Sequence, residues 1–512
     1  MDGKKIIFLV IFLSLLIFIV GIMTDLKFSD EIFHFWLAKD WFIQQARPVY
    51  NKIVDTVEEN QCFRFYVHGP LWQSGFVFLW KIYGDISKNI IQFYQAFIYF
   101  LLLIFTYLLT VELYKNKKIA FYATIITGTL PLFAAFGILL FEEVPIAMLT
   151  ILCLLLLVKH RFFLAGIIMG LMFLTKRNSY LLFPVFALLC FGWKGFYDAS
   201  LRRRFLNIFL FSLITLLIVF PDFKWRKDHL GGLIIPNDKG KLCALIGTSI
   251  SLPLLSTPIA SSSQQLKYVN KQPKIKSINF LPETIHNPYN LPKYLGIIFP
   301  LLFLFYLLHI KTLFHERDII LLLPITIYIP LMLFFFKGWL GYRYLASVFP
   351  MATIISCKAL EKMPRKYLIP ILSLCFLQFF STLYFVDKER KVSPSETQYL
   401  TFIKNNTHAD DRLLTPEELF ISFYTERPTI WVNSFNYSGL RFDNMFWSNE
   451  TQKILNNMRI KYLVVEKKRI YVDSRIRHYG GWPKSFVDKL AVFPFLEKVF
   501  ENDAVSIWKV KS

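Results

Sequence analysis

The chain has 512 residues, of which 55% are hydrophobic and 18% are charged, and its mean hydropathy is +0.44. A soluble protein of this size needs more polar surface, so the composition excludes a soluble enzyme and predicts a polytopic membrane protein. The formal net charge is +22, but most cations lie in short loops between apolar runs, which indicates the positive-inside pattern rather than nucleic-acid binding.

The N-terminus resembles a signal peptide, because Lys4 and Lys5 precede the apolar run Ile6–Met23. This run is too long for an h-region and no A-x-A-like cleavage site follows, so we expect an uncleaved first span. Similar runs recur along about the first 390 residues and predict about eleven transmembrane helices. The predicted spans are residues 5–23, 88–113, 118–138, 144–158, 162–176, 180–193, 204–220, 294–310, 318–336, 343–358 and 367–386.

The segment Gly69–Gly84 is apolar but short, and charge decides its placement. If it does not cross the membrane, Lys4, Lys5 and all the short basic loops fall on one face. If it crosses, every later basic loop moves to the other face, against the positive-inside rule. We therefore expect an interfacial helix here, a cytoplasmic N-terminus and an extracytoplasmic C-terminal segment.

Three outer loops follow from this topology: residues 24–87, a very short turn at "LLFEEVP", and residues 221–293. The third loop is rich in lysine, which fits either binding of a phosphate or anionic lipid, or an ordinary solvated loop. Cys62 and Cys243 lie in the two long outer loops, and a disulfide between them stays open.

The C-terminal segment, residues 393–512, is predicted to be a small α/β domain, separate from the membrane domain of residues 1–390. "SPSE" from Ser393 and "TPEE" from Thr415 both have the pattern of a capping box with proline at the first helical position. "TIWV", "KYLVVE" and "AVSIWKV" are typical of strands, and "LEKVF" is expected to pair with the last of them as a hairpin.

Ionisable residues gather at the outer ends of the predicted spans, at a depth where a lipid-linked substrate presents its head group. They are Asp30 and Glu31 after the first span, His68 at the start of the interfacial helix, Glu142 and Glu143 before the fourth span, Lys176 and Arg177 after the fifth, and Arg343 with Tyr344 at the start of the tenth. Single residues of this kind can simply mark the end of a span. As a set on one face they indicate a functional site.

Five stretches of the sequence carry a family resemblance. They are "SDEIFHFWLAKDW", "HGPLWQSGFVFLWKIYG", "LLFEEVPIAMLTILCLLLL", "GIIMGLMFLTKRNSYLLFP" and "GYRYLASVFPM". In order and spacing they resemble the GT-C class of integral-membrane glycosyltransferases, in particular the protein O-mannosyltransferase and lipid A aminoarabinose transferase group. The C-terminal segment is similar to that group only in its placement after the last span.

The resemblance implies transfer of a sugar from a polyprenyl-phosphate donor to a protein, lipid or glycan acceptor on the extracytoplasmic face, with inversion at the anomeric carbon. The first acid of the family's Asp-Glu pair is catalytic, which implies Asp30 as the general base and Glu31 as its helper or as an acceptor ligand. Cations would stabilise the leaving phosphate. The candidates are Lys176, Arg177, Arg343 and, more weakly, His68, with Tyr344 beside them.

The sequence departs from the family pattern at two points. The second acid is usually Asp, whereas this chain has Glu142 and Glu143, and the spacing to Pro145 favours Glu143 as the acceptor or second acidic site. His68 stands where the family often has Lys, and a neutral imidazole is a poorer phosphate partner. We assign no metal ligands. The two carboxylate sites leave room for Mg²⁺ or Mn²⁺, although the Asp-x-Asp spacing of metal-using oligosaccharyltransferases is absent.

The sequence thus predicts a GT-C membrane enzyme in the inner membrane of a prokaryote, with the bilayer, a lipid-linked donor and an acceptor as its partners and no nucleic acid. Two alternatives remain. A transporter or flippase of lipid-linked substrates would be expected to show internal repeats and polar residues near the bilayer midplane, and neither is evident. A ligase or polymerase of lipid-linked glycans would share the topology and use a pyrophosphate-linked donor.

Overall fold

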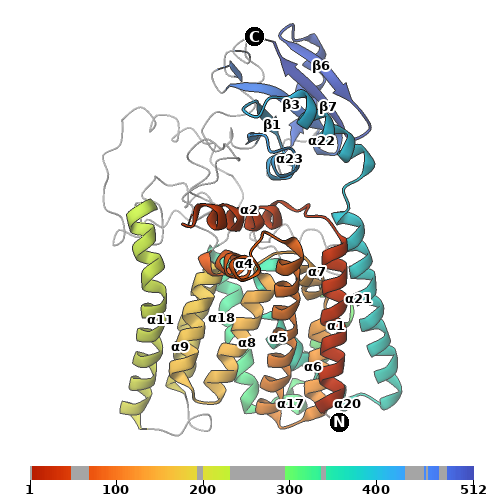
Figure 1. Cartoon of the computed structure of the whole chain (residues 1–512). Coiled ribbons are helices and arrows are strands. Elements are labelled where there is room, and N and C mark those ends of the chain that lie inside the picture. Colours follow the sequence, from red (N-terminus) through yellow and green to blue (C-terminus); the bar gives the residue numbers. More distant parts are fainter. Residues whose placement is uncertain are drawn as a thin grey trace, which may run out of the picture. The chain divides into compact units, whose positions relative to one another are not determined.

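The computed structural model describes most of the chain and divides it into two compact units (Figure 1). The described residues are 3–47, 69–192, 200–230, 295–335, 342–432, 452, 455–456, 459–471 and 481–511. Among them, residues 3–24, 69–230 and 295–389 belong to the first unit, here called the helical unit. Residues 25–47 and those from Arg390 onward belong to the second, here called the sheet unit.

Each of the eleven predicted spans contains a helix of the helical unit. The main helices are α1 (Gly3–Met23), α4 (Pro70–Tyr83), α5 (Lys88–Tyr114), α6 (Lys117–Thr129), α7 (Pro131–Ile138), α8 (Glu143–Val158), α9 (Phe162–Thr175), α10 (Phe183–Phe191), α11 (Leu201–Leu230), α16 (Ile298–Leu308), α18 (Ile319–Phe335), α19 (Phe349–Ser356) and α21 (Leu368–Arg390). Short helices α17 (Ile310–Leu313) and α20 (Ala359–Lys362) lie between them. The predicted apolar segments are therefore helical.

Length and hydropathy together single out fewer spans than eleven. Within the described residues, four helices are long and apolar enough to cross a membrane: Lys4–Met23, Lys88–Tyr114, Leu201–Asp228 and Leu368–Asn406. The pair α6 and α7 qualifies as a fifth, bent by 58° at Leu130, where Pro131 opens the second helix. The other apolar helices are shorter, so a polytopic membrane fold is established while the count of eleven stays a prediction.

Helix α11 is longer than expected. The predicted span ends at residue 220, but the helix continues to Leu230 with Pro221 inside it. A buried ion pair between Asp222 and Arg226, one turn apart, stabilises this extension. The first part of the predicted third outer loop is therefore helical.

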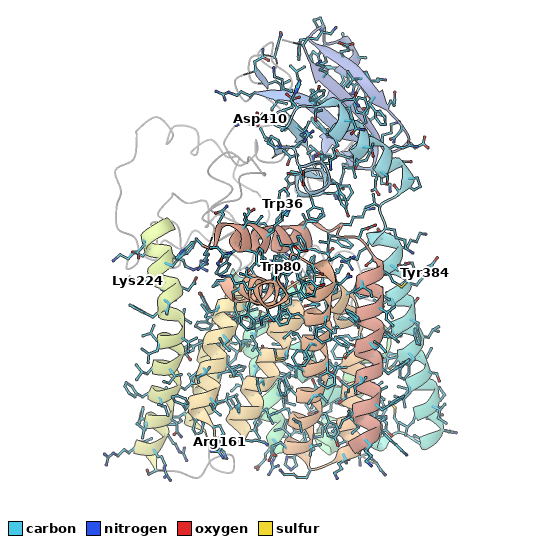
Figure 2. All side chains as sticks on the ribbon, in the orientation of Figure 1. Trp36, Trp80, Arg161, Lys224, Tyr384 and Asp410 are labelled. Carbon is cyan, nitrogen blue, oxygen red and sulfur yellow. The ribbon has the colours of Figure 1, made fainter. Side chains whose placement is uncertain are left out.

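The two ends of the helical unit carry different elements. Figure 1 shows the N-terminus, α17 and α20 at one end, and α4 lying across the other ends of neighbouring helices. Figure 2 labels Arg161 of the basic α8–α9 turn and Trp80 of α4 at opposite ends. The predicted interfacial segment is thus a helix of 14 residues. At 1.5 Å per residue it extends about 21 Å, too short for the ~30 Å hydrocarbon core.

The basic end is held together by a buried polar group, here called the Asp318 cluster (Asp318, Lys358, Tyr114 and Tyr306). The Lys358 ammonium lies 2.6 Å from Asp318, and both side chains are buried. The Tyr114 and Tyr306 hydroxyls donate to the same carboxylate over 2.6 and 2.9 Å. This arrangement joins α5, α16 and the α19–α20 connection at one point.

The sheet unit contains a five-stranded sheet in the order β2-β1-β3-β7-β6. The strands are β1 (Arg412–Thr415), β2 (Thr429–Trp431), β3 (Ile460–Glu466), β6 (Leu496–Glu501) and β7 (Val505–Val510). β1, β2 and β3 are parallel, and β7 is antiparallel to β3 and to β6. The predicted strands and the terminal hairpin are confirmed, whereas β1 was not predicted.

Of the two predicted capping boxes, one is confirmed and one is wrong. Ser393 caps α22 (Pro394–Asn406), with reciprocal bonds between Ser393 and Glu396. Helix α23 (Glu418–Thr425) has no side-chain cap and follows Glu417. Thr415 is instead the last residue of β1, and its hydroxyl donates to buried Glu466. The residue therefore belongs to the strand and does not cap the helix.

Helix α2 (Ser29–Gln44) also belongs to the sheet unit and was not predicted as a helix. Its apolar face packs on α23, where Phe35 and Trp36 each meet the Phe423 ring edge-on or nearly so, at 5.7 and 6.1 Å between ring centres. The Tyr424 hydroxyl donates to the carbonyl of Leu26 over 3.0 Å. The segment that begins with Asp25 is therefore anchored on the C-terminal part of the chain.

Candidate active site

The predicted second acid forms a buried ion pair in the helical unit. Glu143 opens α8, where the helix dipole stabilises a carboxylate. The backbone of Lys176 is extended (φ −147°, ψ 130°), and this residue separates α9 from the 3-10 turn η1 (Arg177–Leu182). The Lys176 ammonium lies 2.6 Å from Glu143 Oε1, with both side chains buried. The backbone break after α9 thus presents a lysine to the start of α8.

Arg343 and Tyr344, from the turn η3 (Tyr342–Leu345), complete this group, here called the Glu143 cluster (Glu143, Lys176, Arg343 and Tyr344). Arg343 Nε lies 3.8 Å from Glu143 Oε1, and its side chain is 31% exposed. The Lys176 ammonium and the Arg343 guanidinium lie 5.3 and 5.1 Å from the centre of the Tyr344 ring. Two cations therefore share one carboxylate and one aromatic ring, and one of them is accessible.

Two residues outside the predicted set of site residues hold the cluster in place. The Asn178 amide donates to the Tyr328 hydroxyl over 2.8 Å, and this hydroxyl donates to the Tyr344 carbonyl over 2.9 Å. Asn178 adjoins the predicted cations, whereas Tyr328 lies in the apolar run of α18. A tyrosine inside an apolar helix was the only sequence signal for it.

Helix α4 is packed on two of the three turns that carry the cluster. The Gly69 amide donates to the Thr175 carbonyl over 3.1 Å, and a Cβ atom on Gly69 would lie 1.9 Å from the Leu174 oxygen. Only glycine, which has no Cβ atom, allows the backbone at position 69 to lie so close to Leu174. The Trp72 indole donates to the Leu140 carbonyl over 3.2 Å, in the turn before Glu143. The predicted interfacial helix thus supports both the acidic and the basic turn.

The predicted base and its helper lie in the sheet unit, in the first turn of α2. Asp30 is half-buried, and His34, one turn later, is buried. Glu31 is fully buried and forms an ion pair with Arg390, which is also fully buried. Arg390 was not among the predicted site residues, and a separation of 359 positions left no sequence signal for the pair.

Further contacts attach the segment before α2 to the start of α22. The Asp25 carboxylate accepts from the Val392 amide over 3.0 Å, and the Lys27 ammonium lies 2.8 Å from Glu396. Burial acts to raise the pKa of Glu396, but hydrogen bonds from Lys27 and Ser393 outweigh burial, and the pKa of Glu396 is lowered. Glu396 therefore serves both as a capping residue and as an ion-pair partner.

The structure brings Glu143, Lys176, Arg343 and Tyr344 together, and it places Glu142 buried at the same turn. Arg177 begins η1, and His68 lies outside the described residues, as do Cys62 and Cys243. Among the residues that the structure describes, no group of three or more His, Cys, Asp or Glu side chains is arranged to hold a metal ion.

Comparisons with known sequences identify no relative: no protein-family model matches the chain, and no curated protein matches it. Solved structures do match. ArnT from Cupriavidus metallidurans bound to undecaprenyl phosphate has a TM-score of 0.61 at 12% identity, with 99% of this chain and 98% of that chain covered.

Two further structures are similar over most of this chain. AglB, an oligosaccharyltransferase from Archaeoglobus fulgidus in complex with an inhibitory peptide and a dolichol-phosphate, has a TM-score of 0.58 at 13% identity, covering 91% of this chain and 70% of that one. The mycobacterial arabinofuranosyltransferase AftD has a TM-score of 0.52 at 11% identity, covering 100% of this chain and 40% of that one. The chain therefore has the GT-C fold of integral-membrane glycosyltransferases, as its motifs predicted.

Proposed function

We propose that this protein is a membrane glycosyltransferase that moves a sugar from a polyprenyl-phosphate carrier to an acceptor on the extracytoplasmic face of a prokaryotic inner membrane. The observation that carries the proposal is the Glu143 cluster, in which two cations from distant turns meet one carboxylate in a GT-C helical unit. Two structures of similar fold were solved with undecaprenyl phosphate and with a dolichol-phosphate, which supports a lipid phosphate as a substrate class.

The roles of the two cations differ. Lys176 is buried and neutralises Glu143 at 2.6 Å, so the charge of the second cation remains available to an anion. Arg343 is more loosely held, at 3.8 Å, and is partly exposed, so its planar guanidinium suits direct binding of a phosphate oxygen. As the bond between sugar and phosphate breaks, the phosphate gains negative charge, and preorganised cations stabilise that charge in the transition state.

The acceptor hydroxyl needs a base, and Asp30 is the residue we assign to it. Its carboxylate takes the proton from the acceptor oxygen, which attacks the anomeric carbon. The bond from that carbon to the phosphate oxygen breaks, and the electron pair leaves with the polyprenyl phosphate. Attack from the side opposite the leaving group inverts the anomeric configuration. A positioned carboxylate of this kind contributes about 10²–10⁴-fold to the rate.

The decisive experiment is the Asp30→Asn variant, tested for sugar transfer in membranes supplied with polyprenyl-phosphate sugars. We expect a rate loss of at least about 100-fold with donor binding retained. Asp410→Asn is the matched control, because Asp410 is exposed in the sheet unit (Figure 2) and should leave the rate unchanged. Near-normal transfer by the Asp30 variant would remove the assignment of the base.

A second candidate function is the ligation of glycans from a pyrophosphate carrier, favoured by the likeness to an oligosaccharyltransferase. Sugar or glycan transfer measured with a monophosphate-linked and a pyrophosphate-linked donor in parallel distinguishes this function from the first. A transporter is less well supported, because the ion pairs described in the helical unit lie in the turns and ends of its helices, whereas transporter sites gather polar groups at the midplane.

A further inference from the structure

The buried ion pair between Glu31 and Arg390 is the least expected feature of the sheet unit. Both side chains are fully buried, and the pair joins the first turn of α2 to the last residue of α21. Removing one member of such a pair leaves an uncompensated buried charge. A pair of this kind holds its two backbone segments in one arrangement.

We propose that Arg390 is a positioning residue for the transfer reaction, which fixes Asp30 by neutralising and holding the adjacent Glu31. The inference rests on the proposed function, because it takes Asp30 as the base. Asp30 and Glu31 are consecutive residues in one helical turn, so an anchor on the second restrains the backbone of the first. Catalytic groups need such restraint, since small displacements of a reacting group are costly to the rate.

Secondary contacts make the anchor specific. The Lys27 amide donates to the second oxygen of Glu31 over 3.3 Å, so both carboxylate oxygens are used. The Lys27 ammonium donates to the Lys391 carbonyl over 3.0 Å and pairs with Glu396. The connection before α2 is therefore attached at several points to the residues that follow α21, with the Glu31 pair buried beside it.

The pair also controls the charge beside the base. The ionisable groups around Glu31 come from the connection before α2, from α2 itself, from the end of α21 and from α22 and α23. They are Asp25, Lys27, Asp30, His34, Arg390, Lys391, Glu396 and Tyr424. While Arg390 compensates Glu31, Asp30 has a neutral neighbour. Without Arg390, a second carboxylate charge stands next to Asp30 and favours its protonation.

The test uses the full chain in lipid nanodiscs and compares Arg390→Gln, the charge-neutral double variant Glu31→Gln with Arg390→Gln, and Lys467→Gln as a control. Lys467 pairs with Glu501 on the exposed surface of the sheet unit, so the loss of its charge should change little. For Arg390→Gln we expect kcat to fall at least about 10-fold, with donor KM within about 3-fold of wild type. The acidic limb of the pH–rate profile should move up by about one pH unit.

The double variant removes both charges, so its acidic limb should return to the wild-type position even if kcat stays low. Hydrogen exchange of the amides of Asp30–Trp36 should speed up in Arg390→Gln and not in Lys467→Gln. A folded Arg390→Gln protein with wild-type kcat, pH profile and exchange would overturn the proposal.

The two proposals fail in different ways. If the wild-type protein transfers no sugar, or if Asp30→Asn is active, the proposed function or its base is wrong. The exchange measurement then still decides whether Arg390 holds the first turn of α2, and unchanged exchange refutes that role. If transfer depends on Asp30 but Arg390→Gln only lowers the yield of folded protein, the function stands and the positioning role falls.

Discussion

Each end of the helical unit contains a buried pair of a lysine and a carboxylate, and the two pairs have different surroundings. At the basic end Lys358 lies 2.6 Å from Asp318, and at the end that carries α4 Lys176 lies 2.6 Å from Glu143. The Asp318 carboxylate also accepts from two tyrosine hydroxyls and a backbone amide. The Glu143 carboxylate is instead approached by a second cation, Arg343, which is partly exposed.

This difference separates a structural pair from a candidate binding site. A carboxylate saturated by buried donors gains nothing from a further ligand, so the Asp318 cluster stabilises helix packing. A carboxylate shared by two cations, one of them accessible, leaves positive potential for an anion. The distance within a buried ion pair does not distinguish the two cases, whereas the neighbours of the pair do.

The largest effect is expected for Lys176→Gln. This change removes the buried cation of the Glu143 cluster, so we expect sugar transfer to fall about 100-fold or more. Stability should fall less than in the corresponding change at Lys358, because Arg343 is close enough to compensate Glu143 in part. Initial rates with a lipid-linked donor check the first point. Full activity would contradict the assignment of the cluster.

Next in size is Lys358→Gln at the basic end. The change leaves Asp318 buried without its ammonium partner, and we expect a loss of about 3–5 kcal/mol in the free energy of unfolding. The rate per folded molecule should stay near that of wild type. Thermal denaturation in detergent, together with assays on the folded fraction, measures both quantities. A specific loss of transfer without a loss of stability would assign function to this end as well.

A smaller effect is expected for Arg343→Lys. Lysine keeps the charge but loses the planar pair of donors, so donor KM should rise about 10-fold with kcat less affected. Arg317→Lys is the matched control, because Arg317 donates to the Leu113 carbonyl at the basic end. The donor KM of each variant is measured by titrating the donor. Equal KM values would argue against phosphate binding by Arg343.

The smallest effect concerns a third buried carboxylate, Glu466 in β3, whose hydroxyl partner is Thr415. Burial, and next the nearby Glu417 carboxylate, raise the pKa of Glu466 to about 8. Since this pKa lies above the ordinary value of 4.5, its contribution to stability is complete below about pH 4.5 and is lost as pH rises through about 8.

Glu466→Gln should abolish this pH dependence. Hydrogen exchange of β3 amides, compared between wild type and variant at each pH, should show equal protection at pH 5 and better protection of the variant at pH 8. Identical behaviour of the two proteins across this range would mean that Glu466 ionises normally.

The sequence by itself determined the positions of the apolar helices of the helical unit, the hairpin of β6 and β7, and the Ser393 cap. Each of these depends on neighbours within a few residues, on apolar length, strand alternation or local hydrogen bonds. It also identified Glu143, Lys176, Arg343 and Tyr344 as candidates. Ionisable residues beside transmembrane spans carry a high desolvation cost, so they can be recognised from the sequence alone.

Only the tertiary structure decided what those residues touch. The pairing of Glu31 with Arg390 and of Asp318 with Lys358 joins positions far apart in the chain, and no local pattern specifies a distant partner. Thr415 fits a helix cap in sequence, yet the register of β1 beside β3 gives its hydroxyl to Glu466. Buried charges take their partners from packing, which is why their identity could be predicted and their pairing could not.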